Sequence, residues 1–372
     1  MERKPMRRQK KTGAQTRLTG SLSEAGGAGR RSAKRAGAGS TPAKAKRTRA
    51  ASRAPAKSRK SEAARERPRG PGGRVAIGGV WLSSPDRVPY PEDGITKLEV
   101  AEYYEAAAEW LLPHIRNRPL TLVRCPDTYR SCFFQKHIDE NKVYDAVKPI
   151  EVMEEKGPGL YAAVDSLEGV MSFVQLGTLE FHTMGCRADR LEQPDRFTLD
   201  LDPGPGVPFS RIVRSAHTIR ELLRELELES FVKTTGGKGL HVVVPIGRRR
   251  EWDEVKEFTR GVASLLVSAA PDEYTISVSK ARRKGKILID YLRNARGSIA
   301  VEAYSTRSRA GGTVATPVSW EELTPDLDPQ AFNVRTMAKR FASLDRDPWD
   351  GYARVRQSIT AAIYRRVMEA AV

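Results

Sequence analysis

The segment FTLDLDPGPG, residues 197–206, joins the pattern of a buried β-strand to two acidic side chains. Its apolar residues alternate with Asp200 and Asp202, and strand positions two apart share one face. Two carboxylates on one face of an apolar strand raise each other's pKa unless a cation lies between them. Because hard divalent cations prefer carboxylate oxygens, the pair predicts a Mg²⁺ or Mn²⁺ site at the end of this strand.

A third acid extends this predicted site. The stretch KILIDYL, residues 286–292, repeats the apolar pattern with a single acid, Asp290. Simpler roles stay open, because Asp202 can cap the DPG turn and Asp290 can meet a backbone N–H at a strand end. Phosphatases of the haloacid-dehalogenase type also carry DxD after an apolar strand, but they need a hydroxyl residue where this chain has Gly204. Three strand-borne acids favour a two-metal site for nucleotidyl transfer, with Asp200, Asp202 and Asp290 as metal ligands and catalytic residues.

A glycine-rich turn supplies a complement to the acids. The segment TTGGKGLH, residues 234–241, places small residues and one lysine between two strand patterns. Backbone N–H groups and a lysine can cradle phosphates in such a turn, although most turns of this kind are plain hairpins. The Walker pattern is absent and a strand follows the turn. The predicted phosphate cradle consists of Thr235, Gly236, Gly237, Lys238 and Gly239.

The body of the chain predicts an α/β fold with mixed sheets, because strand and helix patterns do not alternate strictly. Thr96 and Glu99 form a capping-box pattern that begins a helix reaching residue 115. Further helices are expected over 209–228 and 252–269, and a polar, largely helical region over 324–372. Expected strands include PLTLVR, SCFFQKH, FVKTT, LHVVVPI, YTISVSK, KILIDYL and SIAVEAYS, and residues 160–182 predict strand, helix and strand.

The positive charge of the chain is concentrated at its N-terminus. The 372 residues carry a formal charge of +18, and residues 1–75 alone hold 23 Lys or Arg against 4 Asp or Glu. The remaining residues hold 41 basic and 42 acidic side chains, a net of −1. We expect 1–75 to be a disordered tail that binds a polyanion, with a solubilising linker as the alternative. No apolar run resembles a signal peptide or membrane span, so no membrane partner is expected.

Three cysteines, Cys125, Cys132 and Cys186, form no CxxC pair. An odd, sparse set predicts a reducing compartment without a disulfide framework. Cys125, Cys132 and His137 are near one another in the sequence, but a structural zinc site needs four ligands, so zinc is disfavoured.

Other candidate site residues have aromatic or basic side chains. His182 ends a strand pattern, where a structural histidine is more common than a functional one. Phe133 and Phe134 are adjacent, so we expect one ring in the core and the other outside, where it can stack on a base. Basic side chains that suit a triphosphate or a nucleic-acid backbone flank two of the strands: Arg282, Arg283, Lys284, Lys286, Arg307 and Arg309.

Over roughly residues 78–345 the chain resembles the polymerase domain of bacterial DNA ligase D, in the archaeo-eukaryotic primase superfamily. The motifs that carry the resemblance are VPYPEDGITKLEVAEYY, LTLVRCPD, CFFQKH, LEFH, FTLDLDPGPGV, KTTGGKGLHVVVP, SKARRKGKILIDYLRNARG and AYSTRSRAGGTVATPVSWEEL. The resemblance implies a catalytic core of two facing β-sheets with flanking helices, partly like an RNA-recognition module. We therefore expect a disordered basic tail over 1–75, a primase-polymerase-like catalytic domain over 76–345 and a helical extension over 346–372.

The resemblance also implies residue roles. Asp200, Asp202 and Asp290 match the metal-binding triad. Phe133 and Phe134 match a pair that stacks on template bases, and Lys97 with its neighbours would hold the 5′-phosphate of a downstream strand. The family pattern before the first helix usually has a lysine where this chain has Arg87, and a leucine at Pro89, so the phosphate contact there is expected to survive with altered geometry. Nucleotide contacts are implied for His182, Thr235, Lys238, Arg283 and Arg307.

The predicted function is template-directed nucleotide addition at DNA ends or gaps, in non-homologous end joining. The expected cofactors are two Mn²⁺ or Mg²⁺ ions, and the expected ligands are NTP or dNTP and gapped or broken DNA with a 5′-phosphate. No KxDG or phosphoesterase motif is found, so a separate ATP-dependent DNA ligase and a Ku-type protein are expected partners in a bacterial cytoplasm, at the nucleoid. A primase that starts chains de novo and a non-catalytic DNA-end-binding adaptor are the alternatives.

Overall fold

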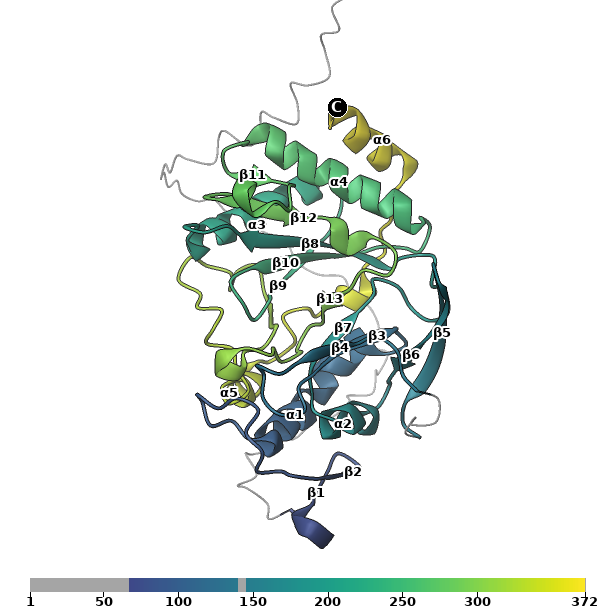
Figure 1. Cartoon of the computed structure of the whole chain (residues 1–372). Helices are drawn as coiled ribbons and strands as arrows, with labels where there is room; N and C mark the ends of the chain where they lie inside the picture. The colour runs from purple at the N-terminus through teal and green to yellow at the C-terminus, as the bar shows by residue number, and fades with distance from the viewer. Residues whose placement is uncertain (1–66, 140–144, 372) are drawn as a thin grey trace, which may run out of the picture.

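The computed structural model describes residues 67–139 and 145–371. Two sheets of six strands each lie between two pairs of helices, and a small β1–β2 hairpin (Val75–Ile77, Val80–Leu82) lies at one end (Figure 1). The mixed α/β architecture with two sheets and flanking helices is thereby confirmed. Most of the predicted tail, residues 1–66, lies outside the described residues. Its last part does not, since Arg67 pairs with Glu102 and Glu105 of the first helix.

The first sheet carries the acidic strands. Its order is β11-β12-β8-β10-β9-β14, and α3 (Phe209–Glu225) and α4 (Trp252–Ala269) cover its outer face (Figure 1). Phe197, Leu199 and Leu201 are buried in the core, so the alternation of β8 turns its aspartates to the opposite face. The strands are β8 (Arg196–Pro203), β9 (Phe231–Thr234), β10 (Leu240–Pro245), β11 (Tyr274–Thr275), β12 (Ile287–Asp290) and β14 (Pro317–Val318).

The second sheet has the order β13-β7-β3-β6-β5, with β4 paired to β3. Helices α1 (Lys97–Ile115) and α2 (Leu167–Gln175) cover its outer face (Figure 1). The predicted capping box begins α1, since the Glu99 N–H donates to Thr96 and the Thr96 N–H donates to the Glu99 carboxylate at 2.8 Å. The strands are β3 (Leu120–Arg124), β4 (Phe133–Gln135), β5 (Lys148–Glu154), β6 (Gly157–Ala163), β7 (Thr178–Thr183) and β13 (Ala300–Val301).

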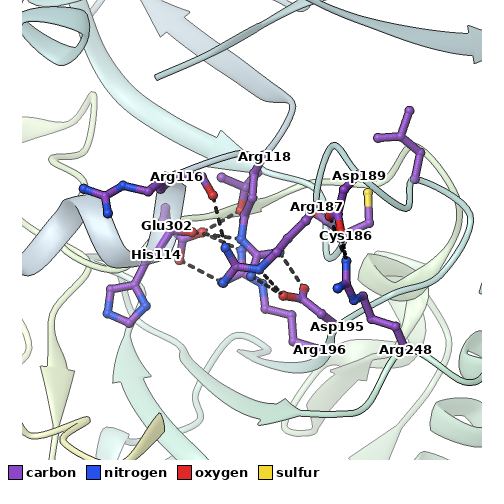
Figure 2. Close-up of polar contacts among 12 residues, drawn as sticks. His114, Arg116, Arg118, Cys186, Arg187, Asp189, Asp195, Arg196, Arg248 and Glu302 are labelled. Atoms are coloured by element: carbon purple, nitrogen blue, oxygen red, sulfur yellow. Dashed lines mark hydrogen bonds and ion pairs between the residues drawn. The ribbon is translucent and has the colours of Figure 1, made fainter. Parts of the chain in front are cut away.

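A buried polar network joins the two sheets (Figure 2). Arg118, just before β3, donates to both carboxylate oxygens of Asp195, just before β8, at 2.6 and 2.7 Å. Arg187 reaches the same carboxylate at 2.8 Å. Arg196 on β8 pairs with Glu302, which follows β13. These pairs fix the acidic strand relative to β7 of the opposite sheet.

The C-terminal region differs from its prediction. Two short helices, α5 (Met337–Ser343) and α6 (Ala361–Ala370), stand among turns, so a largely helical region was wrong. Apolar side chains anchor this region, because Trp349 in a turn is 3% exposed and Val367 of α6 is fully buried. The strands expected in YTISVSK and SIAVEAYS are each only two residues long.

The expectation of no disulfide was also wrong. Antiparallel pairing sets Arg124 of β3 opposite Phe133 of β4, so the residues flanking that pair, Cys125 and Cys132, meet and form a disulfide. Cys186 is a buried free thiol. In the part of the chain that the structure describes, no helix has the length and apolarity needed to span a membrane.

Candidate active site between the two sheets

A cavity of about 160 Å³ opens between the sheets and gathers most of the predicted site. The first sheet contributes its acidic strand and glycine turn, and the second contributes β7 and the loop after β13. A larger cavity, of about 1170 Å³, lies against residues 347–363 and holds no predicted site residue. Those predicted residues that line the smaller cavity are His182, Asp200, Asp202, Thr235, Gly237, Lys238, Gly239 and Arg307.

The three aspartates lie on neighbouring strands. The register pairs Asp290 of β12 directly with Asp200 of β8. The Arg293 guanidinium contacts both, with Nε 3.2 Å from Asp200 Oδ2 and 3.3 Å from Asp290 Oδ2. Arg283 Nη2 lies 3.2 Å from Asp202 Oδ2. The acids predicted from separate segments are thus adjacent, and each faces an arginine.

Burial sets the protonation of this group. Burial and the nearby Asp200 charge raise the pKa of Asp202, and burial raises the pKa of Asp290. Burial also opposes ionisation of Asp200, but His241, Arg293 and Lys233 outweigh it and hold the pKa of Asp200 below its usual range. Carboxylates crowded in this way are stabilised in their charged form by a further cation.

The donor set suits a hard divalent cation. All three side chains offer carboxylate oxygens, the ligands that Mg²⁺ and Mn²⁺ prefer. Asp200 is 5% exposed, and its Oδ1 is buried without a hydrogen-bond partner. Within residues 67–139 and 145–371, the structure has no group of three His, Cys, Asp or Glu side chains close enough together to hold a metal ion. In the candidate site, arginines lie against the acids. The residues therefore fit the ion by chemistry, and their present arrangement is held by Arg283 and Arg293.

The glycine turn lies tightly against the acidic strand. It joins β9 to β10 as an antiparallel hairpin, as predicted. Gly236 has φ of +66°, which favours glycine. A side chain at Gly239 would meet the Leu201 carbonyl oxygen at 2.5 Å, so only glycine allows this approach. Lys238 is exposed at the tip, where the cavity opens.

The opposite wall is organised by Glu180. His182 is 8% exposed, and its Nε2 lies 2.8 Å from Glu180 Oε2. The same oxygen lies 3.0 Å from Arg307 Nε, and the Ser308 N–H donates to the other oxygen at 2.7 Å. These contacts lower the pKa of Glu180 to about 2 although burial opposes the shift. Arg307 also donates to the Thr235 carbonyl, which links this wall to the glycine turn.

Both rings of the Phe133–Phe134 pair are exposed, at 47% and 67%, so the expectation of one core ring was wrong. Strand β4 is three residues long and pairs only with β3, so neither of its faces is covered by core. The Arg124 guanidinium lies 5.4 Å from the Phe133 ring centre, and the Phe134 ring meets His182 edge-on at 6.0 Å. An aromatic platform therefore adjoins the candidate active site.

Lys97 and Arg87 do not line this cavity. Lys97 is 4% exposed, and its Nζ donates to Ser83 O and to both side-chain and backbone oxygens of Gln175 at 2.8–3.0 Å. Burial lowers the pKa of Lys97 to about 8. Arg87 donates to the carbonyls of Cys125 and Asp127 at 2.9 and 2.7 Å. Both cations thus hold protein oxygens, and their role at a 5′-phosphate stays a prediction.

The sequence interpretation missed four residues of the site. Arg293 follows Asp290 by three positions, and Glu180 precedes His182 by two, so both were recoverable from helical-turn and strand spacing. His241 and Lys233 became visible only through the hairpin register, which sets His241 beside Asp200 and Lys233 beside His241. Arg309, whose basic character was noted, also lines the cavity.

Comparison with known proteins shows which family this chain resembles. A family model described as "LigD, primase-polymerase domain" matches residues 96–349. The chain is 40% identical over 316 residues to "Multifunctional non-homologous end joining protein LigD" of Pseudomonas aeruginosa, covering 81% of this chain and 38% of that protein. It is 27% identical over 288 residues to "Bifunctional non-homologous end joining protein LigD" of Bacillus subtilis, covering 77% of this chain and 46% of that protein.

One solved structure matches the fold of this chain over most of its length. "Polymerase Domain from Mycobacterium tuberculosis Ligase D in complex with DNA" matches with a TM-score of 0.68 and 30% identity, over 73% of this chain and 96% of that one. The chain therefore spans less than half of the two named relatives and nearly all of the solved polymerase domain.

Proposed function

Because the chain belongs to the LigD primase-polymerase family, we propose that it is a template-directed nucleotidyltransferase that extends or fills DNA ends in non-homologous end joining. The observation that carries the proposal is the cavity itself. Asp200 and Asp202 face a wall of cationic and N–H donor groups across about 160 Å³, and Asp290 lies beside Asp200 on the adjacent strand. This pairing suits an incoming triphosphate held between metal ligands and phosphate-binding groups.

We assign the residues of the candidate site to separate roles in this reaction. Asp200, Asp202 and Asp290 would hold two Mg²⁺ or Mn²⁺ ions, which supply activation of the primer 3′-hydroxyl and charge neutralisation at the leaving pyrophosphate. The Thr235–Gly239 turn, with Arg283, would bind the phosphates through N–H groups and cationic side chains. Glu180 would orient His182 and Arg307 toward the nucleotide. Phe133 and Phe134 would stack on template bases.

The partners follow from the same reasoning. The proposed substrates are a primed DNA gap or broken end and an NTP or dNTP. Lys97 and Arg87 are the proposed contacts for a downstream 5′-phosphate, and the basic residues 1–75 would add salt-dependent affinity for the DNA backbone. A Ku-type end-binding protein and an ATP-dependent DNA ligase are the proposed protein partners, in a bacterial cytoplasm at the nucleoid.

Primer extension tests the proposal. The purified chain should extend a primer across a 5′-phosphorylated gap, with NTP or dNTP and with Mn²⁺ or Mg²⁺ in separate reactions. The Asp200→Ala/Asp202→Ala double variant should lose incorporation and keep DNA binding, whereas Asp272→Ala/Glu273→Ala, which removes two exposed acids elsewhere, should keep both. Extension by the first double variant would refute the metal assignment. Synthesis on unprimed single strands would point instead to a primase, and a parent protein that binds DNA without extension would be an adaptor.

A further inference from the structure

One row of side chains crosses four neighbouring strands at the back of the candidate active site. The register sets Asp290 beside Asp200, Asp200 beside His241, and His241 beside Lys233. Directly opposed residues on neighbouring strands have Cβ atoms about 4.5–5.5 Å apart, so each side chain can act on the next. Two proposed metal ligands form one end of the row, and a lysine forms the other.

Burial of the Lys233 side chain has a cost in folding free energy. It is 2% exposed, and its Nζ finds no hydrogen-bond partner among the residues that the structure describes. Glu302, the acid that acts most strongly on its charge, is already engaged by Arg196 and Thr183. A buried ammonium without a partner lowers stability, and an apolar side chain of similar volume would cost less. Packing alone therefore gives no reason for a lysine here.

The unpaired groups face one small cavity. A space of about 20 Å³ is lined by Lys233 and His241, together with Arg196, Glu302 and Arg293. His241 is 3% exposed, and its Nδ1, like Lys233 Nζ, has no partner in the described structure. A polar cavity holds one water molecule from about 10–15 Å³ upward. One water can thus bridge Lys233 Nζ to His241 Nδ1.

The chemistry of lysine then selects one form of the histidine. An ammonium group offers only donors, so the water accepts from it and turns its own O–H groups away from that cation, which makes His241 Nδ1 the acceptor of the bridge. The ring proton must then lie on Nε2, which faces Asp200 Oδ2 at 3.4 Å. With Oδ2 held by this N–H, Asp200 presents its unpartnered Oδ1 to a cation. The opposite tautomer would set a ring lone pair against the carboxylate.

We propose that Lys233 is a positioning residue of the metal site, which fixes the tautomer of His241 and through it the orientation of Asp200. The inference deepens the proposed function and rests on it. Groups that hold a metal ligand from behind typically change metal affinity about 10- to 100-fold. Lys233 touches neither nucleotide nor metal in this scheme, because His241 separates it from the cavity and Asp200 stands between His241 and the proposed metal.

Direct Mn²⁺ binding tests the proposal. Electron paramagnetic resonance of free Mn²⁺, in a titration of the full chain, should show about 10- to 100-fold weaker binding for Lys233→Met than for the parent. Lys148→Met, which removes an exposed lysine on β5, should bind as the parent does. Thermal unfolding of Lys233→Met should be unchanged or raised, which separates lost positioning from lost folding. Unchanged Mn²⁺ affinity in a folded Lys233→Met variant would overturn the proposal.

Two further measurements keep the test sharp. Long-range ¹H–¹⁵N spectra at about pH 6, below the Lys233 pKa, should show the proton of His241 on Nε2 in the parent and a loss of that preference in Lys233→Met. Combining Lys233→Met with His241→Gln should weaken Mn²⁺ binding no more than His241→Gln alone, because the two act in series. An additive double variant or an unchanged tautomer would contradict the relay. A parent chain that binds no Mn²⁺ would instead refute the proposed function.

Discussion

Gly204, directly after the acidic strand β8, offers the most direct test of how the candidate site is held. Its N–H donates to the Lys286 carbonyl at 2.8 Å, and the Gly285 N–H donates back to the Pro205 carbonyl at 3.1 Å. A Cβ at Gly204 would overlap the Arg283 carbonyl oxygen and lie 2.7 Å from its carbon. These two hydrogen bonds between residues 204–205 and 285–286 form a backbone clasp, which depends on the absence of a side chain at Gly204. Gly204→Ala should break it.

The magnitude follows from these distances. A Cβ stays at least 3.0 Å from other heavy atoms, so the Arg283 carbonyl oxygen, 1.7 Å from the Cβ position, must retreat by about 1.3 Å. Loss of two backbone hydrogen bonds costs about 2 kcal/mol of unfolding free energy, or about 4 °C in Tm. Arg283 also carries the contact to Asp202, and a displacement of about 1 Å at a reacting centre can cost about 100-fold in rate.

The assay is single-turnover primer extension beside thermal unfolding. Gly206→Ala is the matched control, because Gly206 lies two residues away with φ of +85° and nothing within 4 Å of its Cβ position. It should lose about 1 kcal/mol of stability through backbone strain and keep its rate. Equal rates for Gly204→Ala and the parent, or equal rate losses in both variants, would refute the clasp.

Three other outcomes are expected. Replacing Phe133 or Phe134 by alanine should weaken primer–template binding by about 1–3 kcal/mol per stacked base, measured by fluorescence anisotropy, with Tm unchanged because both rings are exposed. Glu180→Gln should raise the KM for nucleotide more than it lowers kcat, because the lost charge loosens His182 and Arg307. Steady-state kinetics in which kcat falls and KM stays unchanged would contradict this. Burial opposes ionisation of Asp195, but Arg118, Arg196 and Arg187 outweigh it and lower the pKa of Asp195 from 3.8 to about 2. About 2 kcal/mol of unfolding free energy should therefore be present above pH 3.8 and vanish as the pH falls through 2. Urea unfolding of Asp195→Asn should lack this pH-dependent part.

The local patterns of the sequence were sufficient for the elements that bear the site. Alternation along β8 predicted which face Asp200 and Asp202 share, and the Thr96–Glu99 pair predicted where α1 begins. The glycine turn was predicted to join two strands, because strand-like runs stand on each side of it. Each of these signals is contained within a few neighbouring residues.

The missing parts depend on how strands pair and side chains pack in the folded chain. The Cys125–Cys132 bond and the exposure of both phenylalanines follow from how β4 lies on β3, which no short pattern specifies. The direction of the Lys97 side chain, which enters the protein to meet Gln175, also could not be predicted, because a basic residue in a first helical turn does not show which way it points.

The interleaving of the two sheets has a consequence for cooperativity. Residues 120–183 build the second sheet and 196–290 the first, yet β13 returns to the second and β14 to the first. Neither sheet is therefore a continuous piece of chain, and neither can be cut out or melt by itself. The acids and the nucleotide wall should be gained and lost in a single transition, so a partly unfolded chain that still binds one half of its substrate is not an available state.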